Sequence, residues 1–256
     1  MDSVLFFLMR KGNSGIGQYA LFRRIPQEIC IYYGEIATSR DHVPPKLLLE
    51  QPFPSNLKTV SCCLKCNQGF SFDEQYFLIL LGQIGTSSTI KAKVSSGGVI
   101  DRTLSRAPAL DRRLFESLEI DEDGRIVIHP EYERINRVIK KIAIGLFALR
   151  YGRVPASNVV GPVGAYPYNI EDQRPLPFFI ATFTERFRSK QWQDTQPKVF
   201  SHIFVRDPQS SSKVWCVMDF HQTLWGVVHL PNPKSVKTKS DRQLWLFSPM
   251  PTNPRR

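Results

Sequence analysis

Four short pieces of the sequence carry the side chains best suited to chemistry, at residues 30–34, 40–46, 55–57 and 63–67. Within them, Asp41 and His42 place a hard oxygen ligand beside an imidazole, and Asn67 adds a second oxygen ligand directly after a Cys-x-x-Cys pair. Oxygen ligands suit a divalent cation such as Mg²⁺, and a neutral imidazole suits general-base work. These residues predict a single-metal phosphodiesterase centre in which His42 deprotonates water while the cation neutralises the scissile phosphate.

The cysteines are unevenly distributed along the chain. Four of the five, Cys30, Cys62, Cys63 and Cys66, lie within one short stretch, whereas Cys216 stands alone far downstream. An odd number of cysteines in a chain without a recognisable signal peptide argues against a disulfide framework and for a reducing compartment. The cluster therefore predicts metal binding, and Cys216, between two apolar residues, is expected to be a core thiol.

The elements that must position these residues include a helix directly after the cysteines. The stretch from Ser71 to Glu74 has the Ser-x-x-Glu form of a capping box and is followed by a run of apolar residues. It predicts a helix from Ser71 to Gly82, with Glu74 in the structural role of a cap. A Ser- and Gly-rich stretch at residues 95–98 then indicates a turn or linker.

A second helix is predicted over residues 131–151. Apolar residues recur there at three- and four-residue intervals, and Gly152 supplies a stop. Its exposed face is expected to be basic and to present Arg134, Arg137 and Lys141 to the phosphates of a nucleic acid.

The remainder of the chain is expected to form an antiparallel sheet and a tail. Apolar and aromatic stretches separated by polar or proline-containing turns predict strands at residues 178–183, 199–205, 214–220 and 225–230. The sequence thus indicates an α+β protein. Its expected parts are an N-terminal arm (1–27), the module that carries the chemistry (28–85), a linker and irregular segment (86–130), a helix-plus-sheet region (131–230) and a basic proline-rich tail (231–256).

The charge balance favours a polyanionic partner. The chain has 34 Lys and Arg residues against 23 Asp and Glu, a formal net charge of +11, so its surface field attracts polyanions, of which nucleic acid is the first to consider. Apolar stretches such as residues 4–9 are far shorter than the ~20 residues needed to cross a bilayer. The sequence therefore predicts a soluble, cytoplasmic protein with a nucleic-acid partner and no membrane partner.

Residues 30–77 resemble the HNH (His-Asn-His) endonucleases of the standalone bacterial and phage type, which carry the series Cys-x-x-Cys, Asp-His, Asn and Cys-x-x-Cys-Asn. The resemblance implies a ββα-metal fold with the Asp-His pair on its first strand. It also implies that Asp41 and Asn67 bind a catalytic Mg²⁺ or another divalent ion, and that His42 is the general base. Asn56 would then orient His42 or fix the hairpin loop.

In that family two cysteine pairs hold a structural zinc, and here the first pair is incomplete, because Tyr33 stands where its second cysteine would be. The resemblance implies Cys30, Cys63 and Cys66 as zinc ligands, one fewer than the four that Zn²⁺ needs. Three alternatives stay open. Cys62 donates the fourth thiolate, a water molecule completes the site, or no zinc binds and apolar neighbours hold the hairpin.

The resemblance and the charge together predict a metal-dependent endonuclease that hydrolyses the phosphodiester bonds of DNA, with RNA as the alternative substrate, in restriction, phage defence or a mobile element. Arg40 and Lys46, beside the Asp-His pair, are further candidate phosphate contacts. One alternative function is that of a catalytically lost relative that only binds nucleic acid, for which the missing cysteine is the motive. Another is that of a zinc-type adaptor that binds protein, for which the long C-terminal half is the motive. The intact Asp41, His42 and Asn67 argue for the enzyme, because a binding module needs no general base beside two oxygen ligands.

Overall fold

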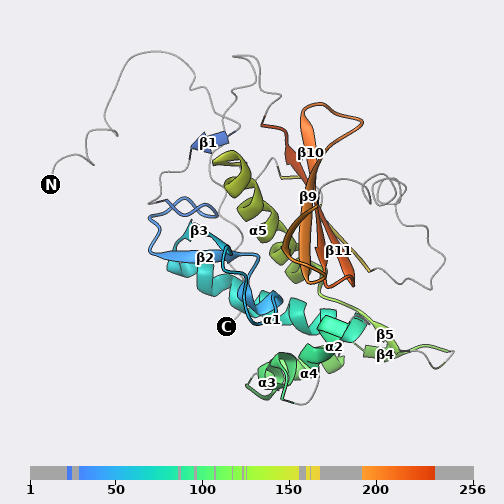
Figure 1. Cartoon of the computed structure of the whole chain (residues 1–256). Coiled ribbons are helices and arrows are strands. Elements are labelled where there is room, and N and C mark those ends of the chain that lie inside the picture. Colours follow the sequence, from blue (N-terminus) through green and yellow to red (C-terminus); the bar gives the residue numbers. More distant parts are fainter. Residues whose placement is uncertain are drawn as a thin grey trace, which may run out of the picture.

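The computed structural model describes residues 22–24, 29–85, 88–94, 97–106, 108–116, 118–122, 124, 126–155, 160–161, 163–167 and 192–233. In these ranges the chain combines antiparallel strands with helices (Figure 1), which confirms the predicted α+β class. Among the same residues, no helix is both long enough and apolar enough to cross a lipid bilayer.

A hairpin followed directly by a helix carries most of the predicted site residues: β2 (Ser39–Val43), η2 (Lys46–Leu48), β3 (Lys58–Cys62) and α1 (Leu64–Ile84). The two strands pair antiparallel, with His42 opposite Thr59. Side chains alternate between the two faces of a strand, and in β2 Asp41 and Val43 are buried, whereas Arg40 is exposed and His42 partly exposed. Strand β2 therefore turns its carboxylate inward and its imidazole outward.

Helix α1 begins well before Ser71, so the predicted helix start at Ser71 is wrong. The N-cap is Cys63, whose Sγ accepts a hydrogen bond from the backbone N–H of Cys66 (3.4 Å). Ser71 lies inside the helix, where its Oγ donates to the carbonyl of Gln68 (2.7 Å), a back-bond open to serine within a helix. Glu74 therefore does not cap the helix, and its carboxylate takes another partner.

The predicted linker contains regular structure, so the expectation of an irregular segment over residues 86–130 is wrong for the part that the structure describes. It forms three short helices and a hairpin: α2 (Ser88–Val94), α3 (Val99–Arg106), α4 (Pro108–Glu116), β4 (Leu118–Ile120) and β5 (Ile126–Ile128). Ile90 and Ile100 are buried in the main core. Helices this short depend on such packing more than on intrinsic propensity, so a search for long periodic patterns misses them.

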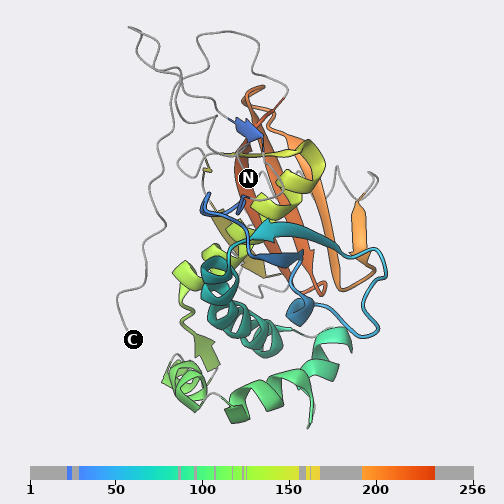
Figure 2. The same ribbon diagram turned by 90° about the vertical axis from the view of Figure 1, so that its left-hand side faces the viewer.

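Helix α5 (Tyr132–Tyr151) confirms the predicted second helix. Gly152 ends it in the left-handed conformation, with φ 62°, and its N–H donates to the carbonyl of Ala148 (2.9 Å), a common way for a helix to end. In both ribbon views α5 lies between the unit formed by the hairpin and α1 and the large sheet (Figure 1 and Figure 2). This central helix therefore contacts both halves of the fold.

The large sheet has five antiparallel strands in the order β7-β11-β10-β9-β8. They are β7 (Val163–Pro167), β8 (Gln193–Gln196), β9 (Phe200–Arg206), β10 (Lys213–Phe220) and β11 (Leu224–Pro231). The strands predicted at residues 199–205, 214–220 and 225–230 are confirmed to within a residue at each end. The strand predicted at residues 178–183 and the tail from residue 234 onward lie outside the described residues.

A small two-stranded sheet joins β1 (Phe22–Arg24) to β6 (Arg153–Pro155). The described piece of the predicted N-terminal arm is thus paired with the residues that follow α5. The rest of that arm, residues 1–21 and 25–27, lies outside the described residues.

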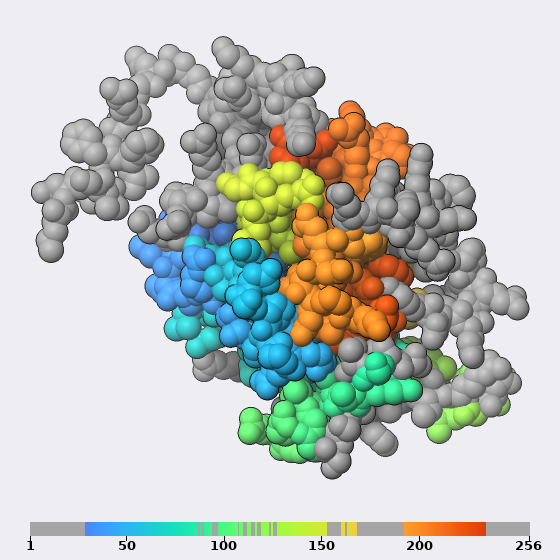
Figure 3. Space-filling view, viewed as in Figure 1, coloured from blue at the N-terminus to red at the C-terminus, as the bar shows by residue number. Residues whose placement is uncertain are grey.

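One hydrophobic core joins the hairpin, α1, α5 and the large sheet. It contains Val43, Phe77, Phe147 and Phe220, one from each of these elements, and the rings of Phe77 and Phe220 meet edge to face with centroids 5.0 Å apart. Cys216 is fully buried in the same core, which confirms it as a core thiol. On the face shown in Figure 3 the hairpin (blue), the end of α5 (yellow) and the sheet (orange) adjoin. Both halves of the chain therefore position the candidate site.

Candidate metal centre

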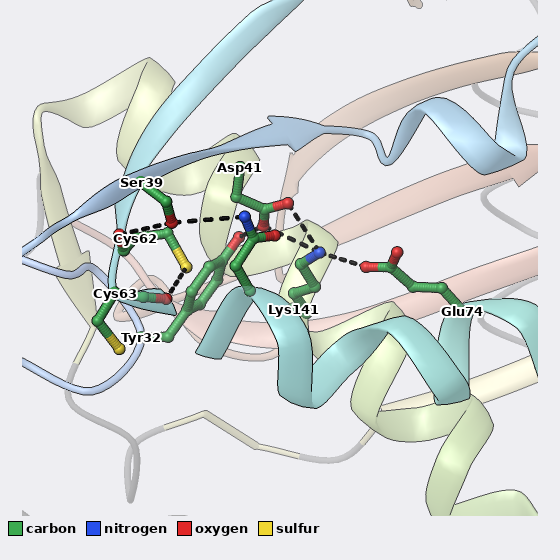
Figure 4. Close-up of polar contacts among 8 residues, drawn as sticks. Tyr32, Ser39, Asp41, Cys62, Cys63, Glu74 and Lys141 are labelled. Atoms are coloured by element: carbon green, nitrogen blue, oxygen red, sulfur yellow. Dashed lines mark hydrogen bonds and ion pairs between the residues drawn. The ribbon is translucent and has the colours of Figure 1, made fainter. Parts of the chain in front are cut away.

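Asp41 is buried and surrounded by hydrogen-bond donors. Its side chain is 6% exposed, and the hydroxyl of Tyr32 donates to its Oδ2 (2.8 Å). The Nζ of Lys141, from α5, lies 3.0 Å from Oδ1 and 2.9 Å from Oδ2 (Figure 4). A carboxylate this buried needs such partners, because an uncompensated charge inside a protein is costly. Two distant parts of the chain therefore fix the orientation of Asp41.

Lys141 is the most deeply buried side chain of this centre. It is 1% exposed, and its Nζ also forms an ion pair with Oε1 of Glu74 on α1 (Figure 4). The prediction that Lys141 belongs to an exposed basic face is therefore wrong. Its position on α5 faces β2 and α1, where two carboxylates compensate its charge.

Two carboxyl groups share the ammonium of Lys141. Burial raises the pKa of Glu74 above its ordinary value, and the ammonium of Lys141 opposes this effect. Burial and the carboxylate of Asp41 raise the pKa of Tyr32 well above its ordinary value, so the phenol stays protonated and donates to Asp41. The carboxyl groups of Asp41 and Glu74 therefore both face one ammonium.

His42 lies on the other face of β2 from its neighbour Asp41 and is partly exposed. Burial lowers its pKa from 6.5, the positive charges of Lys46 and Lys141 act in the same direction, and Asp41 opposes them. The imidazole is therefore mainly neutral at pH 7 and able to accept a proton. Among the described residues it has no hydrogen-bond partner, so its place in the strand alone positions it.

The two predicted asparagines have different surroundings. Asn67, in the first turns of α1, donates from Nδ2 to Oγ of Ser39 (3.4 Å), which lies on the same face of β2 as Asp41. Asn56 is exposed in the loop between the strands, and within the described residues it makes no hydrogen bond to His42. The structure therefore brings Asn67 to the Asp41 side of the hairpin, and it does not place Asn56 as the residue that orients His42.

Three of the predicted zinc ligands come together. The sulfur atoms of Cys30, Cys63 and Cys66 lie within 4.8 Å of one another, close enough to hold one metal ion. Cys63 caps α1 and Cys66 lies in its first turn. Cys30 begins a tight turn, in which the N–H of Gly34 donates to the carbonyl of Cys30 (3.0 Å). Gly34 has φ 87°, a conformation that glycine adopts without steric cost.

The fourth ligand position is less simple, because Cys62 is not part of this group of three. Its Sγ donates to the carbonyl of Cys63 (3.3 Å). Hydrogen bonds from Cys62 and Cys66 lower the pKa of Cys30, which makes Cys30 the sulfur best disposed to ionise. Tyr33 packs against the cysteines.

The other predicted phosphate contacts differ in their exposure. Arg134 and Arg137 form ion pairs with the buried Asp73 of α1, at 3.3 Å and 2.9 Å. Their charge is therefore directed at the neighbouring helix. Arg40 on β2 and Lys46 on η2 are exposed. The exposed positive charge beside the Asp-His pair thus comes from the hairpin region.

Sequence reasoning misses the roles of Tyr32, Glu74 and Lys141. Glu74 has a competing local interpretation as a helix cap, and Lys141 follows another lysine in a run of basic residues. The usable signal is periodicity. Lys141 comes three residues after the buried Val138 and therefore lies on the same side of the helix.

The chain matches no protein-family model, no curated protein and no solved structure.

Proposed function

We propose that the protein is a metal-dependent endonuclease of the HNH type, which hydrolyses phosphodiester bonds in DNA. The observation that carries the proposal is the junction of β2 with α1. It combines the buried carboxylate of Asp41, the neutral imidazole of His42 in the adjacent position, and the amide of Asn67 on the facing helix. These are the residue types that single-metal hydrolysis of a phosphodiester needs.

The residues of the junction fit a divalent cation. Asp41 offers carboxylate oxygens, and Asn67 uses its Nδ2 on Ser39, which leaves its Oδ1 as a ligand atom. Hard oxygen donors are the ligands that Mg²⁺ and Mn²⁺ prefer. The two carboxyl groups that face the single ammonium of Lys141 favour a cation further. When bound, the cation would neutralise the charge of the scissile phosphate.

The other residues divide the remaining work. His42 is partly exposed and neutral at pH 7, so it takes the proton from the attacking water as general base. Arg40 and Lys46 are exposed near it on the hairpin region and contact the phosphates on either side of the cleaved bond. Tyr32 and Lys141 hold the Asp41 carboxylate in place.

The cysteine cluster has a structural role in the proposal. Cys30, Cys63 and Cys66 would hold a zinc ion, and a water molecule would supply the fourth ligand, because the Sγ of Cys62 lies outside this group of three. A zinc ion held by these sulfurs would fasten the turn at Cys30 to the beginning of α1. Asn67 follows Cys66 directly, so this link would also fix the position of a proposed ligand of the catalytic cation.

A second candidate function is binding of nucleic acid without cleavage. The observation in its favour is the pairing of Asp41 with Lys141 and Tyr32. An aspartate with these contacts also serves as a purely structural link between the hairpin and α5. The two candidates share the exposed basic residues and differ only in hydrolysis.

Cleavage of supercoiled plasmid DNA with Mg²⁺, with Mn²⁺ and with EDTA distinguishes the two. We expect nicking or cutting only with a divalent metal, and a loss of about 10²- to 10⁴-fold in rate for His42→Ala, as is typical when a general base is removed. His129→Ala is the matched control, because that histidine is exposed and pairs with Glu119 away from the centre. DNA binding without metal-dependent cleavage, or full activity of His42→Ala, would contradict the nuclease proposal.

A further inference from the structure

Tyr32 and Lys141 together use most of the coordinating capacity of Asp41. A carboxylate offers about four lone-pair positions, and the contacts with Tyr32 and Lys141 use three of them. A Mg²⁺ ion bound to either oxygen would lie about 2.0–2.1 Å away. The Nζ of Lys141 lies 3.0 Å and 2.9 Å from the same two oxygens. The two positive charges would therefore lie beside the same carboxylate and repel each other.

We infer that Lys141 and the divalent cation compete for Asp41, and that Glu74 retains Lys141 when the cation binds. This inference rests on the proposed function, because it takes Asp41 to be a cation ligand. It assigns a role to two residues outside the Asp-His and Asn positions. Lys141 keeps Asp41 compensated before the cation arrives, and Glu74 keeps Lys141 compensated afterwards.

The role of Glu74 follows from the burial of Lys141. An ammonium that is 1% exposed cannot lose its partner without a large desolvation cost. The carboxylate of Glu74, itself 13% exposed, already contacts the same Nζ from α1 (Figure 4). The flexible four-carbon stem of lysine permits a small movement of the ammonium from Asp41 toward Glu74. Removing Glu74 should therefore make Lys141 bind Asp41 more firmly.

A second ion pair between α5 and α1 offers a matched control, one turn of α5 before Lys141. Arg137 of α5 pairs with Asp73 of α1 at 2.9 Å, so this pair also joins α5 to α1 but makes no contact with Asp41. Substitutions there test for general effects of breaking a link between the helices. Substitutions at Lys141 and Glu74 test the competition.

The experiment measures Mn²⁺ binding to the full chain by electron paramagnetic resonance of the free ion, with folding checked by circular dichroism. Lys141→Met alone leaves two buried carboxylates unpaired, so the principal variant is the double substitution Glu74→Gln with Lys141→Met. It removes one positive and one negative charge and keeps the net charge of the centre. Its affinity therefore reports competition rather than net charge.

We expect the double variant to bind Mn²⁺ about tenfold more tightly than the wild type, within the range of coupling that linked sites usually show. Glu74→Gln alone should weaken binding several-fold, because Lys141 then has no alternative carboxylate. Arg137→Met should change the affinity less than twofold. Asp41→Asn should abolish the binding in every background.

Two other results are informative in different ways. If Asp41-dependent Mn²⁺ binding is present but the double variant binds no more tightly than Arg137→Met, the competition is overturned and the proposed cation site stands. If neither the wild type nor the folded double variant binds Mn²⁺ in an Asp41-dependent way, the cation site itself fails, and the inference fails with it.

Discussion

Gly145 of α5 lies directly against Val43 of β2. A Cβ atom at Gly145 would come 2.6 Å from Cγ2 of Val43, so the absence of a side chain allows the helix to approach the strand this closely. Lys141 lies one turn earlier on α5, and Asp41 lies two residues earlier on β2. One turn of helix and two residues of strand span similar lengths. The close contact therefore brings Lys141 level with Asp41.

Alanine at position 145 is expected to destabilise the protein. Gly→Ala within a helix normally adds about 0.5–1 kcal/mol of stability, but overpacking typically costs about 1–3 kcal/mol, and here the obstacle includes Val43 Cβ at 3.4 Å as well as its two methyl groups. We expect Gly145→Ala to lower the free energy of unfolding in urea by up to about 2.5 kcal/mol, the largest difference between these two effects.

Gly69 provides the control for this prediction. It lies inside α1, and a Cβ there would meet nothing within 4 Å. Gly69→Ala should therefore raise the free energy of unfolding by up to about 1 kcal/mol. A Gly145→Ala protein as stable as Gly69→Ala would show that α5 does not need its close approach to β2.

The cysteine cluster is expected to bind one zinc ion per chain and to stabilise the module by doing so. Elemental analysis should give a ratio close to one for the wild type, and Cys63→Ser or Cys66→Ser should lose the ion and lower the melting temperature, because metal binding contributes directly to folding. Tyr33→Cys should slow zinc loss to a chelator by adding a thiolate at a position that packs against the cluster of Cys30, Cys62 and Cys63.

Cys62 and Cys216 test the ligand set. Cys62→Ser should retain the zinc, because its sulfur lies outside the group of three, and Cys216→Ala should lower stability without changing the zinc content, because that thiol is buried in the hydrophobic core. Zinc that depends on Cys62 but not on Cys30 would contradict the proposed ligands.

Local sequence patterns predict α5 and three strands of the large sheet well, because each has several periods of apolar residues and a clear stop. The Asp-His pair and three cysteines are likewise visible as types at fixed spacings. Lys141 shows where such reasoning ends. Its two carboxylate partners lie 100 and 67 residues away in the sequence, so no local sequence pattern predicts that Lys141 is buried in contact with them.

The prediction that α1 begins at Ser71 fails for a different reason. Ser71 has the right neighbours for a cap, yet Cys63 caps the helix instead. A capping box describes only what a helix would gain by beginning there. In the structure α1 begins earlier, directly after β3, which pairs with β2 and ends at Cys62 beside the other cysteines.

Nucleic-acid affinity is expected to depend on Arg40 and Lys46 more than on the arginines of α5. Each phosphate contact contributes about 0.9 to the slope of log affinity against log salt. Replacing both exposed residues by Gln should therefore reduce that slope by about 2. Arg134→Gln with Arg137→Gln is the control, and it should reduce the slope by less than about 1, because both arginines pair with Asp73. A larger reduction in slope for the arginine variant than for the Arg40 and Lys46 variant would instead place the nucleic-acid surface on α5.

Acid is expected to destabilise the fold through two buried histidines of the sheet region. Burial, and then the charge of Arg150, lowers the pKa of His202 to about 4, and burial, and then Lys93, lowers that of His221 to about 4. In the unfolded chain both titrate near the ordinary value of about 6.5. Between these pH values the unfolded state binds more protons than the folded state, so stability falls as the pH falls.

His202→Phe tests this link between protonation and stability. The Nδ1 of His202 is buried without a hydrogen-bond partner in the described part of the chain, and the ring lies between those of Phe200 and Phe204, so an apolar ring suits the position. Each histidine contributes up to about 3 kcal/mol between pH 6.5 and 4. Urea unfolding across this range should therefore show a shallower loss of stability for His202→Phe than for the wild type. Parallel curves for the two proteins would show that His202 is protonated in the folded state as readily as in the unfolded chain.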